Sequence, residues 1–402
     1  MKTRLLASVL AALFLASGAA PARAQSVFGV NFLGEHRFTG GARFRALGLS
    51  SYAVRDTSYA VAANDASLAD ISSVTFSIFE SFTSSGVRSG SASADINRFQ
   101  LPTVMLGVPL GKRFAAAVGY RERFEGRGEF SYPLPVEGGI SGVERYRHRA
   151  SLFTVPFVAA WKAAPWASAA ASLNLERGSI TDVATVLFNN DLYGDVDSRR
   201  ERGYAGLSWA VSVLVEPHRR LSLGAGFNSA VEYDVTESFT YSNDALDSSA
   251  SWDFRLPPSW GAGAAVGVTE RWWLSSYFWR REAPEPAGFR QLEGSIGDER
   301  LVSFGVERRR SKEGGFFARA PIRAGFYEDR WHLEYPAGRP VRSRFFTLGS
   351  GFGLPGGPGA IDFALEFGQI GSIDDNGVDE RVFRFSVSVS ASEAWSKRRS
   401  ER

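Results

Sequence analysis

The sequence predicts an all-β fold: a transmembrane, antiparallel, up-and-down β-barrel of about 14 strands. Three observations indicate this fold. Apolar and polar residues alternate along many segments, the connections between these segments are alternately short and long, and the chain begins with an export signal. After that signal, no apolar run reaches the roughly 18 residues that a membrane helix needs. A closed barrel is the other structure that pairs every backbone polar group within lipid.

Residues 1–24 have the three parts of a secretory signal peptide. A basic start is followed by the apolar stretch Leu5–Leu15 and by the small-x-small cleavage site Ala22–Ala24. We therefore expect a mature chain that begins at Gln25 and is exported to the cell outer membrane. The chain contains no cysteine, which excludes disulfide bonds and thiol nucleophiles.

Residues 72–395 are the expected barrel. The alternation is clearest in Phe383–Val389, where apolar residues share one face and polar residues share the other. The same pattern predicts strands at residues 72–82, 97–109, 113–124, 146–161, 166–178, 201–215, 220–233, 252–268, 271–281, 299–310, 316–328, 341–353, 359–369 and 381–395. Long connections such as 125–145 and 177–200 are typical of outer loops, and the short ones of periplasmic turns. An even number of strands also places a C-terminal tail, residues 396–402, in the periplasm.

Residues 25–71 precede the first expected strand. They are too few for an independent domain, and they combine glycine and arginine with the apolar stretch Tyr59–Ala63. We expect them to fold as a hatch inside the barrel lumen. A disordered periplasmic leader is the alternative, and the apolar stretch argues against it.

Several motifs resemble the long-chain fatty-acid transporter family of outer-membrane proteins. Gly41–Val54 is similar to that family's N-terminal Ala-Arg-x-x-Gly region, and Ala63–Leu68 is similar to its Asn-Pro-Ala-x-Leu stretch. Further similar segments are Leu256–Gly263, Pro321–Phe326 and Phe383–Trp395. The resemblance implies a fourteen-stranded barrel with an N-terminal hatch. It also implies uptake of hydrophobic molecules, with a lateral opening in the barrel wall as one route.

The second motif provides the candidate hatch residues Asn64, Asp65, Ala66 and Leu68. Asp65 stands where the family has proline. Proline fixes the backbone angle φ, and an aspartate side chain can form a turn by bonding to its own neighbouring backbone. We therefore expect the local turn to be kept.

Charged residues fall on the polar faces of the last predicted strands: Glu307, Arg323, Asp362, Glu366 and Arg384. Charge inside lipid is costly, so we expect these side chains to face the lumen. They either tune permeation through a channel or form salt bridges that anchor the hatch.

A second candidate site is an outer loop at residues 180–193. Its apolar residues include Val186, Leu187, Phe188 and Leu192. They form either a capture surface for hydrophobic ligands or a loop that packs on its neighbours.

The remaining observations limit the function. The 4 histidines lack the spacing of metal ligands, so we expect no metal, no cofactor and no enzyme activity. A net charge of +3 without a basic patch argues against nucleic-acid binding.

The sequence thus predicts an outer-membrane barrel that takes up or binds small hydrophobic molecules, fatty-acid-like or aromatic. One alternative is a non-transporting barrel that serves as a docking or assembly component of an envelope or secretion complex, with a protein partner. A second alternative is an open diffusive porin. In each case the expected partners include the outer-membrane bilayer and, during biogenesis, the barrel-assembly machinery.

Overall fold

The computed structural model describes residues 26–393 apart from positions 91, 136–140, 189–193, 243–247, 286–293, 311–319 and 355–358. The predicted signal peptide, the predicted tail and Leu192 lie outside the described residues. The described part is mostly β-sheet, with a few short helices. No helix in it is long and apolar enough to cross a membrane.

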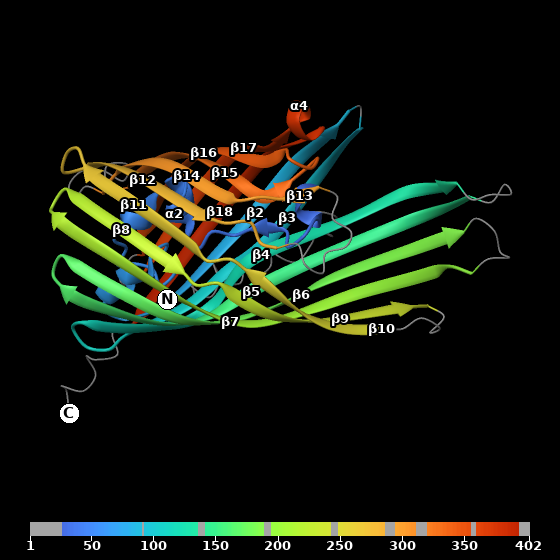
Figure 1. Cartoon of the computed structure of the whole chain (residues 1–402). Helices are drawn as coiled ribbons and strands as arrows, with labels where there is room; N and C mark the ends of the chain where they lie inside the picture. Colours follow the sequence, from blue (N-terminus) through green and yellow to red (C-terminus); the bar gives the residue numbers. More distant parts are fainter. Residues whose placement is uncertain are drawn as a thin grey trace, which may run out of the picture.

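Fourteen antiparallel strands form the wall of a closed barrel (Figure 1). The wall strands are β2 (Val74–Ser89), β3 (Ala92–Pro109), β4 (Phe114–Pro135), β5 (Ser141–Ala164), β6 (Ala167–Phe188), β7 (Val196–His218), β8 (Leu221–Asn228) continued by β9 (Val231–Tyr241), β10 (Ser248–Leu256) continued by β11 (Ser259–Gly267), β12 (Trp272–Arg281), β13 (Ser295–Ile296) continued by β14 (Glu299–Arg308), β15 (Ile322–Glu334), β16 (Pro340–Gly353), β17 (Ala360–Ser372) and β18 (Val378–Glu393). β18 pairs with β2 from Glu393↔Val74 to Asp379↔Arg88 and closes the sheet. Closure removes the sheet edges that lipid does not tolerate.

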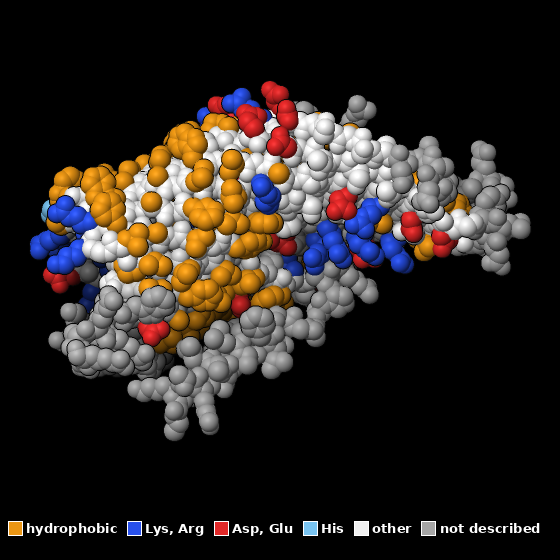
Figure 2. Space-filling model, turned by 90° about the horizontal axis from the view of Figure 1, so that it is seen from below, with side chains coloured by type: hydrophobic (Ala, Val, Ile, Leu, Met, Phe, Trp, Pro, Cys, Tyr) orange, Lys and Arg blue, Asp and Glu red, His pale blue; other side chains and the backbone are white. Residues whose placement is uncertain are grey.

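The outer surface of the barrel carries a belt of exposed apolar side chains (Figure 2). Members from around the wall include Phe76, Phe99, Val118, Phe157, Leu173, Trp209, Leu223, Trp260, Leu274, Phe304, Phe346, Phe367 and Phe385. Because successive side chains of a strand point to opposite faces, polar residues such as Ser303, Ser386 and Ser388 are buried on the lumen side. The predicted fold class is therefore confirmed, and every predicted strand overlaps one wall strand.

The predicted outer loops at 125–145 and 177–200 are wrong. Most of these residues extend β4–β7, which project together with β9 and β10 beyond the rest of the wall in Figure 1. Outside the bilayer neither face of a strand has to be apolar, so the alternation that marks a membrane strand fades there. Val186, Leu187 and Phe188 consequently lie in β6 rather than in a loop.

The chain before β2 forms a series of short elements. They are η1 (Phe28–Val30), β1 (Glu35–His36), α2 (Ala42–Ala46), η2 (Ser51–Ala53) and η3 (Asp65–Asp70). We refer to residues 26–71 as the N-terminal segment. A single helical turn, α4 (Ile373–Asn376), connects β17 to β18 at the outer end of the barrel (Figure 1).

The outward register of the final strand generates a prediction. Phe385→Arg places a charge in the apolar belt, where a mid-depth arginine costs about 2–4 kcal/mol. Thr236→Arg is the control, because Thr236 is exposed on the protruding part of β9, away from the apolar belt. We expect folding into lipid vesicles, followed by heat-modifiable gel mobility, to fail or weaken for Phe385→Arg and to stay normal for Thr236→Arg. Equal barrel yields for the two variants would contradict the register.

Candidate functional site

The N-terminal segment lies in the barrel lumen. α2 contacts β15–β18, η2 contacts β8, β11 and β12, and η3 contacts β4–β7. A short segment can touch strands all around a closed sheet only from inside. Ala42, Leu47, Leu49 and Leu68 of the segment are almost completely buried, so the segment contributes much of the interior packing.

A glycine on β15 allows the segment to approach the wall closely. A Cβ atom on Gly325 would lie 2.3 Å from the carbonyl carbon of Leu47. Gly48, which follows, has a positive φ of 61° and meets the backbone of Phe326. The close backbone contact at Gly325 and the positive φ at Gly48 each favour glycine, which has no Cβ atom. The Pro321–Phe326 stretch, singled out by its family resemblance, thus positions the end of α2.

Three of the predicted lumen residues form one ion-pair network. Arg323 on β15 donates to Glu307 on β14 (Nε–Oε1, 2.8 Å) and to Asp362 on β17 (Nη1–Oδ1, 2.6 Å). Arg43 of α2 brings a second guanidinium to Glu307 (Nη2–Oε2, 2.8 Å). The network therefore connects the N-terminal segment to the wall.

Glu366 and Arg384 belong to a second network. Arg384 on β18 lies 3.6 Å from Glu366 on β17 and donates to Glu35 of β1 (Nη2–Oε1, 3.1 Å). Glu35 also accepts hydrogen bonds from Arg37 (2.8 Å) and from Arg98 on β3 (3.0 Å). All five predicted lumen residues thus lie in the interior.

β1 supplies part of the wall where β3 and β4 separate. The pairing of β3 with β4 ends at Thr103↔Arg121. Farther toward the outer end, β4 pairs with β1 instead, with Glu35 opposite Glu125. Arg98 of β3 reaches across to Glu35 through its ion pair. The N-terminal segment therefore both occupies the lumen and fills a break in the sheet.

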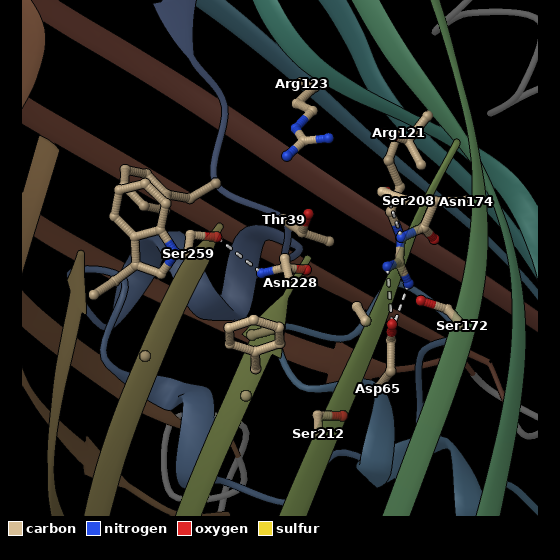
Figure 3. Close-up of a pocket in the computed structure, with 18 of the residues that line it drawn as sticks. Thr39, Asp65, Arg121, Arg123, Ser172, Asn174, Ser208, Ser212, Asn228 and Ser259 are labelled. Carbon is tan, nitrogen blue, oxygen red and sulfur yellow. Dashed lines mark hydrogen bonds and ion pairs between the residues drawn. The ribbon is translucent and has the colours of Figure 1, made fainter. Parts of the chain in front are cut away.

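The hatch motif lies at the start of η3. Asn64 caps η3 by accepting a hydrogen bond from the Ala66 amide (3.0 Å), and its side chain donates to a β7 carbonyl (3.0 Å). Asp65 forms a two-pronged ion pair with Arg121 on β4 (2.6 and 3.0 Å; Figure 3). Leu68 is buried. The aspartate at the family's proline position is thus a contact to the wall, and sequence reasoning did not identify its partner Arg121.

A cavity of about 730 Å³ lies at the outer end of the barrel, next to η1; we call it the mouth cavity. Its lining is mostly apolar and aromatic and consists of Val27, Phe28, Val30, Asn31, Phe32, Phe130, Tyr132, Tyr146, His148, Asp182, Arg202, Tyr335 and Val378. Ligand pockets commonly have this size and this kind of lining. The predicted capture residues Val186, Leu187 and Phe188 are not part of the described lining.

Asp182 is the centre of a polar corner in the mouth cavity. It accepts hydrogen bonds from the hydroxyl of Tyr146 (2.6 Å) and from Nδ1 of His148 (2.7 Å), and Arg202 lies 3.4 Å away. These polar groups largely satisfy one another. Nε2 of His148 has no hydrogen-bond partner among the described residues, so the mouth cavity offers a ligand both an aromatic surface and a polar corner.

A smaller cavity of about 150 Å³ lies deeper in the barrel (Figure 3); we call it the inner cavity. One side is polar and is formed by Arg121, Glu122, Arg123, Thr154, Asn174, Glu176, Ser208 and Ser212. The other side combines the aromatic residues Phe38, Phe44, Tyr52, Tyr277 and Trp279 with the polar residues Asn228, Ser259 and Arg281. Most of Val27–Phe32 lines the mouth cavity and His36–Thr39 lines the inner cavity, so the N-terminal segment runs directly from one cavity to the other.

The wall beside the inner cavity contains two breaks at one level. β8 and β9 are separated by Ser229 and Ala230, and β10 and β11 by Pro257 and Pro258. Prolines have no N–H for a sheet ladder, so neither proline can donate a hydrogen bond across this stretch. Phe227 borders the inner cavity, and its side chain points outward into the apolar belt, where it packs against Trp209. The inner cavity therefore approaches the lipid-facing surface at this paired break.

Two histidines that are far apart in sequence meet in the interior. His332 and His36 both approach Glu299, with Nδ1 of His332 2.6 Å from Oε1 and Nδ1 of His36 3.6 Å from Oε2. The guanidinium group of Arg281 lies 3.0 Å from the same Glu299 carboxylate, so this carboxylate already has a cationic partner. Among the described residues, no group of three or more His, Asp or Glu side chains is arranged to hold a metal ion.

The Glu35 network generates a second prediction. Glu35→Gln removes the carboxylate shared by Arg98 and Arg384, and breaking a buried pair in this way costs about 3–5 kcal/mol. We expect amides of residues 26–37 to exchange hydrogen for deuterium faster in the folded barrel. Glu232→Gln, which breaks an exposed pair with Arg255, should leave that exchange unchanged. Unchanged exchange in Glu35→Gln would show that the network does not hold the segment.

Comparisons with known proteins support the barrel fold. No protein-family model and no curated protein matches the sequence. A Pseudomonas aeruginosa FadL homologue has a similar solved structure (TM-score 0.64, 12% identity), and the match covers 89% of this chain and 99% of that one. The Ralstonia pickettii toluene transporter TbuX is also similar, with a TM-score of 0.59 and 14% identity over 89% of this chain and 99% of that one. The P. putida toluene transporter TodX has a TM-score of 0.58 and 15% identity, and the match covers 89% of this chain and 100% of that one. The chain therefore shares the fold of the FadL homologue and these transporters, in agreement with the resemblance of its motifs.

Proposed function

We propose that this protein is an outer-membrane barrel that takes up small hydrophobic molecules and that the mouth cavity captures them. The observation that carries the proposal is the aromatic lining of the mouth cavity, next to a lumen occupied by the N-terminal segment. The apolar belt supports placement in a bilayer. Export by the signal peptide at residues 1–24 is part of the same proposal.

The ligand class follows from the shape and chemistry of the mouth cavity. Aromatic side chains such as Phe28, Phe130 and Tyr132 offer flat apolar surfaces, and aromatic rings pack well against one another. Two of the structures that share the fold are named toluene transporters. We therefore propose small aromatic or other apolar molecules as ligands.

The N-terminal segment acts as the hatch in this proposal. It runs from the mouth cavity to the inner cavity, and ion pairs connect it to β3, β4, β14 and β18. With the lumen occupied in this way, an open diffusive porin is not favoured. A bound ligand would have to shift the stretch between Phe32 and His36 to pass.

The route out of the barrel is sideways through the paired break. A hydrophobic molecule gains more by entering lipid than by crossing the polar side of the inner cavity. The side of that cavity that contains the aromatic residues borders the break, where Asn228 and Ser259 line it. We propose that the wall opens there and releases the ligand into the bilayer.

Capture in the mouth cavity can be measured directly. Calorimetric titration of the purified barrel with toluene should show saturable binding. Phe130→Ala should weaken this binding roughly threefold to tenfold, because it removes an aromatic contact from the lining. Phe239→Ala, at a ring that packs edge-to-face with Tyr241 outside the cavity lining, should bind as the unmodified chain does. Absence of saturable binding by the unmodified chain would contradict capture and favour the docking-component alternative.

The lateral route makes a separate prediction. Because the chain contains no cysteine, Asn228→Cys with Ser259→Cys introduces one disulfide across the facing pair next to the break. We expect the oxidised variant to bind toluene normally but to slow its uptake by cells, and reductant to restore uptake. Thr236→Cys with Ser251→Cys links the same two wall strands farther out and should not slow uptake. Equal uptake by both oxidised variants would exclude release at the break.

A further inference from the structure

A group of arginine side chains lies on the outer surface of β4–β7, next to the apolar belt. Its members are Arg127, Arg145, Arg147, Arg149, Arg177 and Arg199. Figure 2 shows basic side chains gathered just beyond the edge of the belt. We call this group the arginine surface.

The arginine surface begins where the apolar side chains end. Along the outward face of β5, Phe157 belongs to the belt, and the exposed residues nearer the outer end are Ser151, then Arg149, Arg147 and Arg145, then Ser141. On β6, Leu173 belongs to the belt and the exposed residue Arg177 follows two positions after Leu175. This is the level at which the headgroups of a surrounding leaflet meet the barrel.

Two positive charges of this surface lie opposite each other on neighbouring strands. Arg127 and Arg149 are direct partners in the β4–β5 register, and like charges at such positions destabilise a sheet. Glu129 lies 3.8 Å from Arg147, and no carboxylate among the described residues pairs with Arg127 or Arg149. The sheet alone therefore leaves this pair of charges without compensation.

All members of the surface are arginine rather than lysine. The planar guanidinium group donates two parallel hydrogen bonds to a phosphate, whereas lysine acts as a point charge. The lumen arginines are already paired with carboxylates. On the arginine surface, Arg145 and Arg147 lie near Glu129 and Arg199 pairs with Glu201 (2.8 Å). Arg127 and Arg149 instead face the headgroup layer, the environment next to them that can supply anions.

We propose that the arginine surface binds phosphate groups of a phosphorylated glycolipid in the leaflet around the outer end of the barrel, with Arg127 and Arg149 as the central pair. The proposal rests on the placement of the barrel in the outer membrane, with the β4–β7 ends outside. It does not depend on which molecule the mouth cavity captures.

The test is a titration of the purified barrel, in neutral detergent, with diphosphoryl lipid A, read by native mass spectrometry. Arg127→Ser with Arg149→Ser should weaken binding roughly tenfold to thirtyfold, as expected for the loss of two cations near an anionic surface. The control is Arg255→Ser with Arg344→Ser, which removes two exposed arginines that have carboxylate partners elsewhere on the wall. It should bind as the unmodified chain does.

Two further titrations, with dephosphorylated lipid A and with inorganic phosphate, identify the anion that binds. Dephosphorylated lipid A should bind weakly to every form of the protein, and inorganic phosphate at matched concentration should not displace the lipid. Equal binding of diphosphoryl lipid A by both double variants, or displacement by inorganic phosphate, would overturn the proposal. Heat-modifiable mobility confirms that both variants fold, and unchanged toluene binding by Arg127→Ser with Arg149→Ser separates this surface from the mouth cavity.

Discussion

Ion pairs between buried arginines and carboxylates hold the N-terminal segment inside the barrel. The charged groups in these contacts neutralise one another. The Glu35 carboxylate pairs with the guanidinium groups of Arg98 and Arg384, and Arg43 pairs with Glu307. A buried charge without its partner costs several kcal/mol, so the occupied lumen is the favoured arrangement. The position of β1 in the wall follows from the same pairs, because Glu35 lies opposite β4 and bonds to β3 at once.

That arrangement determines where a ligand can be held. η1 forms one side of the mouth cavity, and residues 36–39 border the inner cavity. The segment that neutralises the lumen therefore also borders both cavities. Beside the inner cavity the prolines at 257 and 258 interrupt the wall, so one of the breaks in the sheet lies next to this cavity.

Much of the barrel could be predicted because lipid outside and a polar lumen inside impose alternation on every strand. The same reasoning placed Glu307, Arg323 and Arg384 in the interior. The extensions of β4–β7 were missed, because beyond the bilayer no face has to be apolar. The mouth cavity was missed because its lining comes from distant segments, from Val27 to Val378. The paired prolines were visible in the sequence and could have indicated the break.

The central claim is that the N-terminal segment closes the lumen of the barrel. Deleting Phe28–Asp65 removes the segment's contacts but leaves the strand-to-strand hydrogen bonds from β2 to β18. In planar lipid bilayers the intact protein should show almost no conductance, and the deleted form should show large, steady openings. An intact protein that already conducts like an open pore, with no change after the deletion, would contradict the account.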